Sequence, residues 1–97
     1  MDEKRLKGIM GLCVRAGQGV FGEDGCRKAI ATGQSRLLLL DEGASENTRK
    51  RYESLCAATE ARLAMLPEGL LQEATGRPGA AMAVKEGNFA NQVIGCL

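Results

Sequence analysis

The sequence contains no histidine and no tryptophan, and its only aromatic residues are Phe21, Tyr52 and Phe89. Without histidine, Ser–His and Cys–His nucleophile pairs cannot form, and the commonest general base near neutral pH is absent. The sequence therefore predicts a protein that is not an enzyme. Hydrophobic residues make up 44% of the chain, so we expect a core built mainly from aliphatic side chains, methionine and cysteine.

Cysteine is present four times (Cys13, Cys26, Cys56 and Cys96), but no two of these form a CxxC pair. No histidine is available to complete a zinc site, so we expect buried, reduced thiols, no metal and no cofactor. The chain also lacks a signal-like N-terminus and an apolar run long enough to span a membrane. These absences predict a cytoplasmic protein with no membrane partner.

The 97 residues are enough for one domain and leave no room for a second, so residues 1–97 are expected to form a single domain. The net charge is only +1, but it is unevenly distributed. Residues 1–36 hold seven basic and four acidic side chains, whereas residues 37–97 hold six and eight. The first third could face a polyanion, and because it is no cationic tail, nucleic-acid binding would depend on a specific site.

The first helices follow from hydrophobic spacing. Leu6, Ile9, Met10 and Cys13 recur at i, i+3, i+4 and i+7, which predicts an amphipathic helix of about a dozen residues. Glycines between positions 16 and 22 end this pattern. A second helix is predicted to start with Glu23 and Asp24 in its first turn, where acidic side chains suit the positive end of the helix dipole, and to end near Gly33.

The remaining elements alternate between strands and helices. The short run Leu37–Leu40 predicts a strand buried on both faces, and Ser45 is placed to cap a helix that ends near Ala58. Further strands are predicted at 63–66 and 80–84 and helices at 68–75 and 87–96, with Ile94 among the inward residues. Residues 20–21 are the candidate for a fourth strand. Alternation of this kind favours parallel pairing through right-handed crossovers. The predicted fold is α/β, a three-layer α-β-α sandwich with a small, mostly parallel or mixed sheet of about four short strands.

The segment Gly17–Gly22 matches the dinucleotide-binding pattern G-x-G-x-x-G, and a helix and a strand ending at Asp41 follow it. That function would require residues 9–14 to form a strand, whereas their spacing predicts a helix. A nucleotide-binding domain using this turn is therefore the less favoured alternative, and a plain surface turn is the favoured one.

Four segments, taken in order, resemble the kink-turn-binding ribosomal protein family (the L-seven-Ae and L-thirty-e group), and within it the bacterial YlxQ type. They are Gly22-Glu23-Asp24 with Lys28-Ala29-Ile30, Arg36 to Leu40, Ala44 to Thr48, and Gly87 to Asn91. The resemblance covers nearly the whole chain. It implies an α-β-α sandwich that binds structured, kink-turn-like RNA and works in translation or ribosome assembly. The expected partners are ribosomal RNA and the ribosome, with no DNA.

The resemblance places the RNA contacts on a glycine turn and the helix start that follows it, where free N–H groups and the helix dipole suit electronegative atoms. Lys28 matches the family's phosphate-neutralising lysine, and Arg27 could add a second contact. The loop 76–79 matches a second RNA-facing loop, although a plain turn with a solvated Arg77 explains it equally well. The predicted RNA-binding residues are Gly22, Glu23, Asp24, Gly25, Arg27, Lys28, Arg77, Pro78 and Gly79.

The chain departs from the family pattern where archaeal and eukaryotic members carry Asn-Glu, because it has Asp24-Gly25 there. Gln18 also stands where members often carry lysine. An ionised Asp24 cannot donate a side-chain hydrogen bond, and Gly25 has no side chain. The site is thus predicted to use backbone and phosphate contacts more than base reading. A protein-interaction member of the same fold that has lost RNA specificity remains an alternative.

Overall fold

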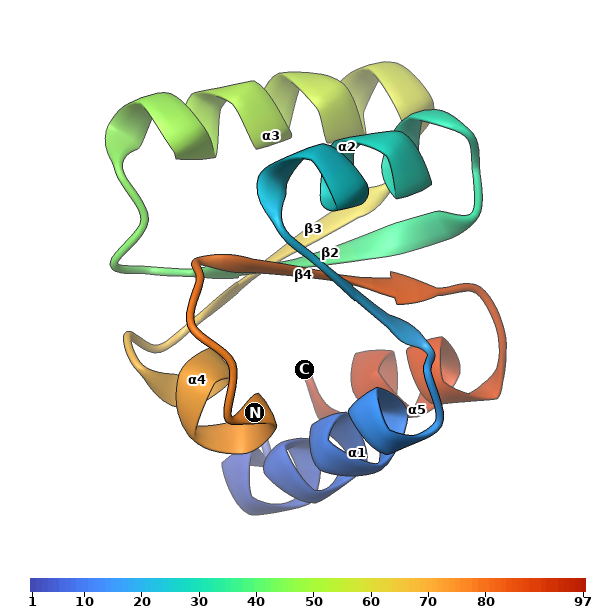
Figure 1. Ribbon diagram of the computed structural model, residues 1–97, viewed down its shortest axis with the longest axis vertical. Coiled ribbons are helices and arrows are strands. Elements are labelled where there is room, and N and C mark those ends of the chain that lie inside the picture. Colours follow the sequence, from blue (N-terminus) through green and yellow to red (C-terminus); the bar gives the residue numbers. More distant parts are fainter.

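The computed structural model describes residues 1–97 and contains five helices and four strands. They are α1 (Glu3–Arg15), β1 (Gly19–Phe21), α2 (Glu23–Ala31), β2 (Ser35–Asp41), α3 (Glu46–Thr59), β3 (Arg62–Leu66), α4 (Leu70–Thr75), β4 (Ala81–Lys85) and α5 (Asn88–Cys96). Figure 1 shows α2 and α3 on one face of the sheet and α1, α4 and α5 on the other. The predicted α-β-α sandwich with four short strands is confirmed.

The strands form one mixed sheet in the order β1-β4-β2-β3. Only β2 and β3 are parallel, because β4 runs antiparallel to both β2 and β1. The parallel pairing favoured by the alternation of elements is therefore wrong for the two pairings that β4 makes, with β1 and with β2, and is correct for β2–β3 alone.

The short connection between β3 and β4 explains the antiparallel pairing. Helix α4 has six residues, so it spans only about 9 Å, whereas a strand of five residues such as β3 is about 16 Å long. Helix α4 is therefore too short to return the chain to the end of the sheet at which β2 and β3 begin, as parallel pairing of β4 would require. Strand β4 therefore enters from the end at which β2 and β3 finish, where the Asp41 N–H donates to the Ala80 carbonyl over 2.7 Å.

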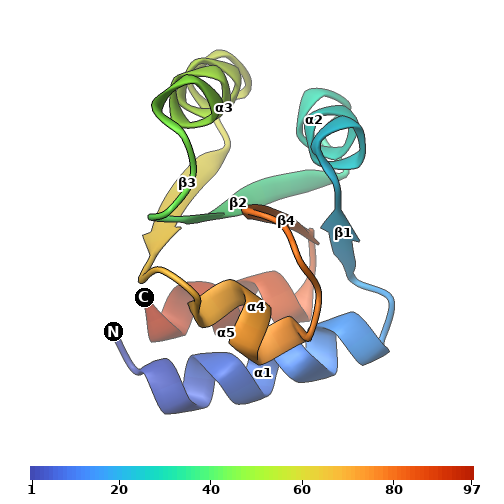
Figure 2. The same cartoon turned by 60° about the vertical axis from the view of Figure 1, so that its left-hand side comes forward.

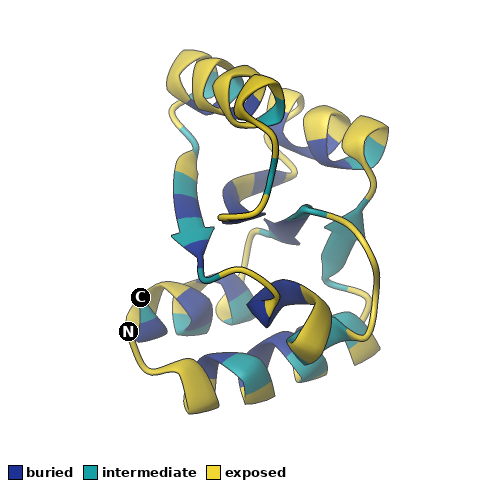
Figure 3. Ribbon diagram, turned by 90° about the vertical axis from the view of Figure 1, so that its left-hand side faces the viewer, coloured by how far each residue is buried: buried dark blue, intermediate teal, exposed yellow.

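Strand β2 separates two hydrophobic cores. Leu37 and Leu39 pack with α1, α4 and α5, whereas Leu38 and Leu40 pack with α2 and α3. All four leucines are at most 1% exposed, so the prediction of a strand buried on both faces is confirmed. Burial of a leucine side chain contributes about 1.5–3 kcal/mol relative to its exposure, which makes this strand the centre of the fold. Figure 3 shows the buried residues on the inner sides of both helical layers.

Two polar residues are buried, and they lie at the two ends of β2. The Ser35 hydroxyl accepts a hydrogen bond from the Leu37 N–H and lies within hydrogen-bond distance of the Val84 carbonyl, at a bulge in the pairing with β4. The Asp41 carboxylate accepts from the N–H groups of Gly43 (2.7 Å) and Gly69 (2.9 Å). Both polar groups are thus satisfied without solvent.

The helix ends follow the predicted signals in part. The Ser45 hydroxyl accepts from the Thr48 N–H and caps α3, as predicted.

All four cysteines are buried and unpaired, so the expectation of buried, reduced thiols is confirmed. The prediction for Ile94 is wrong, because it is 37% exposed: the inward stripe of α5 consists of Ala90, Val93 and Cys96. No helix has the length and apolar character needed to cross a bilayer.

Candidate nucleic-acid interface

Two of the predicted segments, far apart in the sequence, meet at one surface hollow of about 220 Å³. Gly22 and Glu23 line it from the start of α2, and Pro78 and Gly79 line it from the loop that precedes β4. Its remaining lining residues are Thr48 and Tyr52 from α3 and Ala80 and Ala81. The structure thus brings together the glycine turn and the second loop that the sequence assigned separately.

The backbone at Gly22 requires glycine. Its φ of 84° and ψ of 151° fall in a region that residues with a Cβ atom almost never adopt. Space is not the reason, because nothing lies within 4 Å of the position where a Cβ atom would be. This conformation turns the chain from β1 directly into α2.

The start of α2 has no side-chain cap. Asp2 and Ser45 accept hydrogen bonds from the first turns of α1 and α3, whereas Gly22 has no side chain to do so. The first N–H groups of a helix have no acceptor within the helix. The start of α2 lies at the hollow, because Gly22 and Glu23 line it, so the positive end of the helix dipole is there too, an arrangement that favours an anionic ligand.

The acidic side chains at this helix start are both paired with arginines. The Glu23 carboxylate lies 2.9 Å from the Arg51 guanidinium on α3, and the Asp24 carboxylate lies 2.9 Å from the Arg27 guanidinium one turn along α2. These ion pairs offset the negative charge that would otherwise repel a phosphate. Lys28 is exposed and takes part in none of the six ion pairs of the protein, so its ammonium group is available to an anion.

Gly25 allows α2 to pack closely on the strand before it. A Cβ atom at this position would lie 3.1 Å from Cγ1 of Val20, which is tighter than ordinary van der Waals contact. A larger residue is accommodated only if Val20 shifts. The absence of a side chain at position 25 is therefore linked to the packing of α2 against β1.

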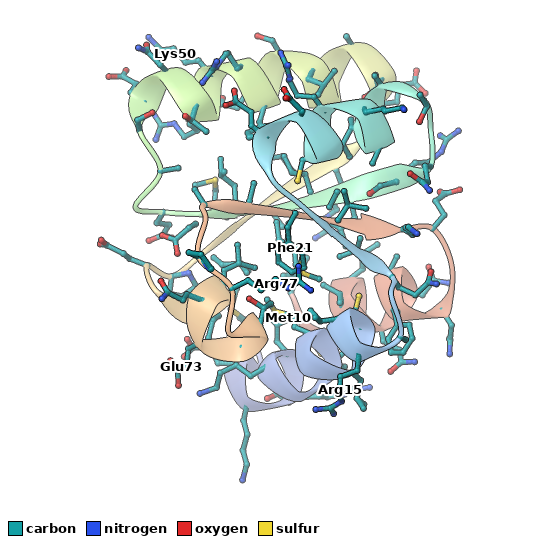
Figure 4. The ribbon with its side chains drawn as sticks, viewed as in Figure 1. Met10, Arg15, Phe21, Lys50, Glu73 and Arg77 are labelled. Carbon is teal, nitrogen blue, oxygen red and sulfur yellow. The ribbon has the colours of Figure 1, made fainter.

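Arg77 is exposed, which agrees with both possibilities considered for it from the sequence, an RNA-facing loop and a plain turn. Its guanidinium lies over the ring of Phe21, 4.8 Å from the ring centroid, as Figure 4 shows for the two labelled side chains. Arg77 does not line the hollow, whereas its neighbours Pro78 and Gly79 do. The arginine thus attaches the loop to β1, and the residues that follow it reach the hollow.

Sequence reasoning placed Tyr52 among the inward residues of α3 but missed that it reaches the hollow. It is 3% exposed, and burial raises the pKa of its hydroxyl to about 12, an effect to which the Cys26 thiol and the Glu23 carboxylate add. Arg27 and Arg51 oppose this rise. The hydroxyl is therefore neutral at physiological pH. The sequence indicates only that the hydroxyl needs a partner or solvent, since a tyrosine on an inward helical face usually directs its polar tip to one of these.

The glycine pattern at 17–22 lacks the structural context of a dinucleotide site. Helix α1 extends to Arg15, so no strand leads into the glycines, and Gly19 lies within β1. The alternative that required a strand at residues 9–14 is wrong, because those residues belong to α1.

Comparison with known proteins identifies one curated relative at clear similarity. The chain is 34% identical over 96 residues to the RNA-binding protein YlxQ of Bacillus subtilis, an alignment that covers 92% of this chain and 91% of that protein. No model of a known protein family matches the chain.

Solved structures share the fold at lower identity. A protein of unknown function from Bacillus halodurans superposes with a TM-score of 0.89 at 24% identity, covering 95% of each chain. The 15.5 kD RNA-binding protein of Giardia lamblia superposes with a TM-score of 0.78 at 12% identity, covering 96% of this chain and 82% of that one.

Fold and glycine turn together define the class, a small α-β-α sandwich of the kind also formed by the 15.5 kD RNA-binding protein of Giardia lamblia. Within that class, the chain belongs to the family of the RNA-binding protein YlxQ. The resemblance inferred from the sequence is confirmed.

Proposed function

We propose that the protein binds structured, kink-turn-like RNA at the hollow between the start of α2 and the loop before β4, and that it is not an enzyme. The observation that carries this proposal is the meeting of an uncapped helix start and a second loop at one hollow. Membership in a family whose relative is an RNA-binding protein supports it.

The chemistry of the hollow suits folded RNA. Proteins read such RNA through shape and through bases that have left their stack, because the major groove of A-form RNA is too narrow for side chains. The backbone N–H groups at the start of α2 would bind phosphate or base-edge oxygens, and Lys28 would neutralise a phosphate. Arg27 and the Pro78–Gly79 turn would complete the contact surface, with Arg77 holding that turn in place.

The proposal extends to the biological setting. We infer a single RNA-binding domain at residues 1–97 with ribosomal RNA as its target, acting in the cytoplasm in translation or ribosome assembly. The resemblance of the sequence to ribosomal proteins supports this choice of target, and the near-neutral charge of +1 favours one specific site over general attraction to polyanions.

Titration with two RNAs tests the proposal. Fluorescence anisotropy is measured with a kink-turn RNA and with a straight duplex of the same base composition. We expect tighter binding to the kink-turn RNA, with an affinity that falls as salt rises. Equal affinity for both RNAs would contradict kink-turn selectivity. No binding to either would contradict the proposed function and favour a protein-interaction role for the same fold.

A charge reversal at Lys28 locates the site. Lys28→Glu is expected to weaken binding by at least about tenfold, because the substitution replaces a phosphate-neutralising charge with a repelling one. Lys4→Glu is the matched control, since Lys4 is also an exposed, unpaired lysine but lies on α1 in the opposite layer. Equal effects of the two substitutions would show that the site is misplaced.

A further inference from the structure

A second groove lies between α2 and α3, with a volume of about 390 Å³. Three of its five lining residues are cationic and none is acidic: Arg27 from α2, Lys50 and Arg51 from α3, with Ser54 and Leu55. In a chain whose net charge is only +1, this is a local concentration of positive charge beside the hollow at Gly22, and Arg27 is the one member already assigned to the contact surface there.

The groove continues from the proposed RNA-binding hollow. Arg51 lines the groove, and its guanidinium contacts Glu23, which lines the hollow. Arg27 stands one turn along α2 from Glu23. Figure 2 shows α2 and α3 on the same face of the sheet, and in Figure 4 Lys50 lies on the side of the molecule away from Arg15 of α1. A ligand seated at the hollow could therefore extend into the groove on the same face.

The cations of the groove are open to a new partner. Their side chains are 54% (Arg27), 68% (Lys50) and 57% (Arg51) exposed, although each is paired with a carboxylate. Those carboxylates, on Glu23, Asp24 and Glu46, lie in the first turns of the two helices and not in the groove. Ion pairs this exposed are weak and are screened by salt, so each cation can contact a phosphate through its exposed side while its carboxylate stays in place.

We propose that this groove binds the backbone phosphates of an RNA stem that flanks the bend held at the hollow. The inference rests on the proposed function and adds to it a second contact surface, of which Lys50 and Arg51 are the cations outside the predicted site. Charge complementarity identifies the occupant as the RNA backbone. Leu55 is the only apolar residue in the groove, and the three cations beside it match the charge of phosphate groups, which a hydrophobic peptide or helix would not.

The test uses two RNAs that share one kink and differ only in the flanking stem, which is long in one and trimmed in the other. Wild-type protein is expected to bind the long-stem RNA more tightly. Lys50→Gln should lose about threefold in affinity for the long-stem RNA near 0.2 M salt, and its salt slope should fall by roughly one, as for one lost phosphate contact. Its affinity for the trimmed RNA should not change.

Arg49→Gln is the matched control. Arg49 precedes Lys50 on α3 and forms the same kind of i,i+4 ion pair, with Glu53 at 3.3 Å compared with 3.4 Å for Lys50 and Glu46, but it does not line the groove. If Lys50→Gln and Arg49→Gln behave alike on both RNAs while wild type binds them, the groove proposal is wrong and the proposed function stands. If wild type binds neither RNA, the proposed function fails, and the groove proposal fails with it.

Discussion

Arg77 and Phe21 form a cation–π contact, with the guanidinium carbon 4.8 Å from the ring centroid. The contact joins the loop before β4 to strand β1, so it fixes Pro78 and Gly79 relative to the turn at Gly22. An arginine that the sequence placed in a candidate RNA-facing loop thus also attaches that loop to β1.

A double-mutant cycle measures this contact. Arg77→Gln and Phe21→Leu are made singly and together, and their free energies of unfolding are measured by urea denaturation. We expect a coupling energy of about 0.5–1 kcal/mol, the usual strength of an exposed cation–π contact. Each single substitution should also weaken RNA binding by loosening the loop. Additive effects on stability would show that the contact contributes nothing.

The turn at Gly22 is predicted to reject a side chain because of its backbone conformation. Gly22→Ala should lower the free energy of unfolding by about 1–3 kcal/mol, since φ and ψ at this position are accessible almost only to glycine. Gly8→Ala is the control: Gly8 lies within α1 with open space around it, so alanine should stabilise by about 0.5–1 kcal/mol. A neutral Gly22→Ala would mean that the turn relaxes into another conformation.

Tyr52 is predicted to titrate near pH 12. The chain has one tyrosine and no tryptophan, so absorbance at 295 nm reports the ionisation of Tyr52 alone. Burial raises the pKa of Tyr52 to about 12 from the ordinary value of 10.0. Between these two pH values, the hydroxyl keeps its proton in the folded protein and loses it in the unfolded chain. The resulting stability is fully present below pH 10 and is lost as the pH rises toward 12.

A substitution separates this effect from that of the thiols. Burial also raises the pKa of the thiols of Cys13, Cys26 and Cys56 from 9.0, so their contribution is lost in the same direction and starts at lower pH. Tyr52→Phe should retain the thiol-dependent decline and remove the additional loss at higher pH, as measured by urea denaturation at a series of alkaline pH values. A 295 nm midpoint near pH 10 in the folded protein would show that the hydroxyl is not desolvated.

The residues at positions 24 and 25 are predicted to control selectivity among RNAs. Asp24→Asn with Gly25→Glu restores the family pair, which can both donate and accept hydrogen bonds, and should raise the preference for a kink-turn RNA over a straight duplex. Asp24→Asn alone is the control for the change in charge. Replacing glycine at position 25 raises the helix propensity of α2, but the added Cβ atom would lie only 3.1 Å from Cγ1 of Val20. Because these two effects oppose each other, the free energy of unfolding should change by less than about 1 kcal/mol. An unchanged preference would exclude base reading at this turn.

Nicotinamide and adenine nucleotides are predicted not to bind. A ligand present at 100 times its Kd stabilises a protein by about 2.7 kcal/mol, a change that a thermal shift assay detects readily. Millimolar nucleotide should leave the melting temperature unchanged, because the glycine pattern follows helix α1 and not a strand. A clear upward shift would reopen the alternative of a nucleotide-binding domain.

The sequence predicted best the elements whose pattern is local. The leucine run of β2 and the Ser45 cap of α3 both depend on neighbouring residues and were predicted correctly. The inward position of Ile94 was wrong, because several faces of α5 are apolar and spacing alone does not show which one meets the sheet. The direction of β4 was missed because it depends on how far α4 can carry the chain.

The candidate site shows the same limit. The glycine turn and the loop at 76–79 could each be found from the residues, and the resemblance to a known family indicated that both contact RNA. Their meeting with Tyr52 at one hollow could not be found, because it depends on the order of strands in the sheet. The ion pair between Glu23 and Arg51 joins two helices for the same reason, and no pattern along the chain indicates it.

The four consecutive leucines of β2 leave this strand with an ambiguity that composition does not resolve. Sliding it by one residue would exchange the sides of the sheet to which its residues point, yet most positions in both cores would still receive a leucine. Ser35 and Asp41 remove the ambiguity, because either would lose its buried partners after such a slip. The alignment of the central strand is therefore specified by two hydrogen-bonding residues at its ends, and the hydrophobic residues between them supply stability without choosing the register.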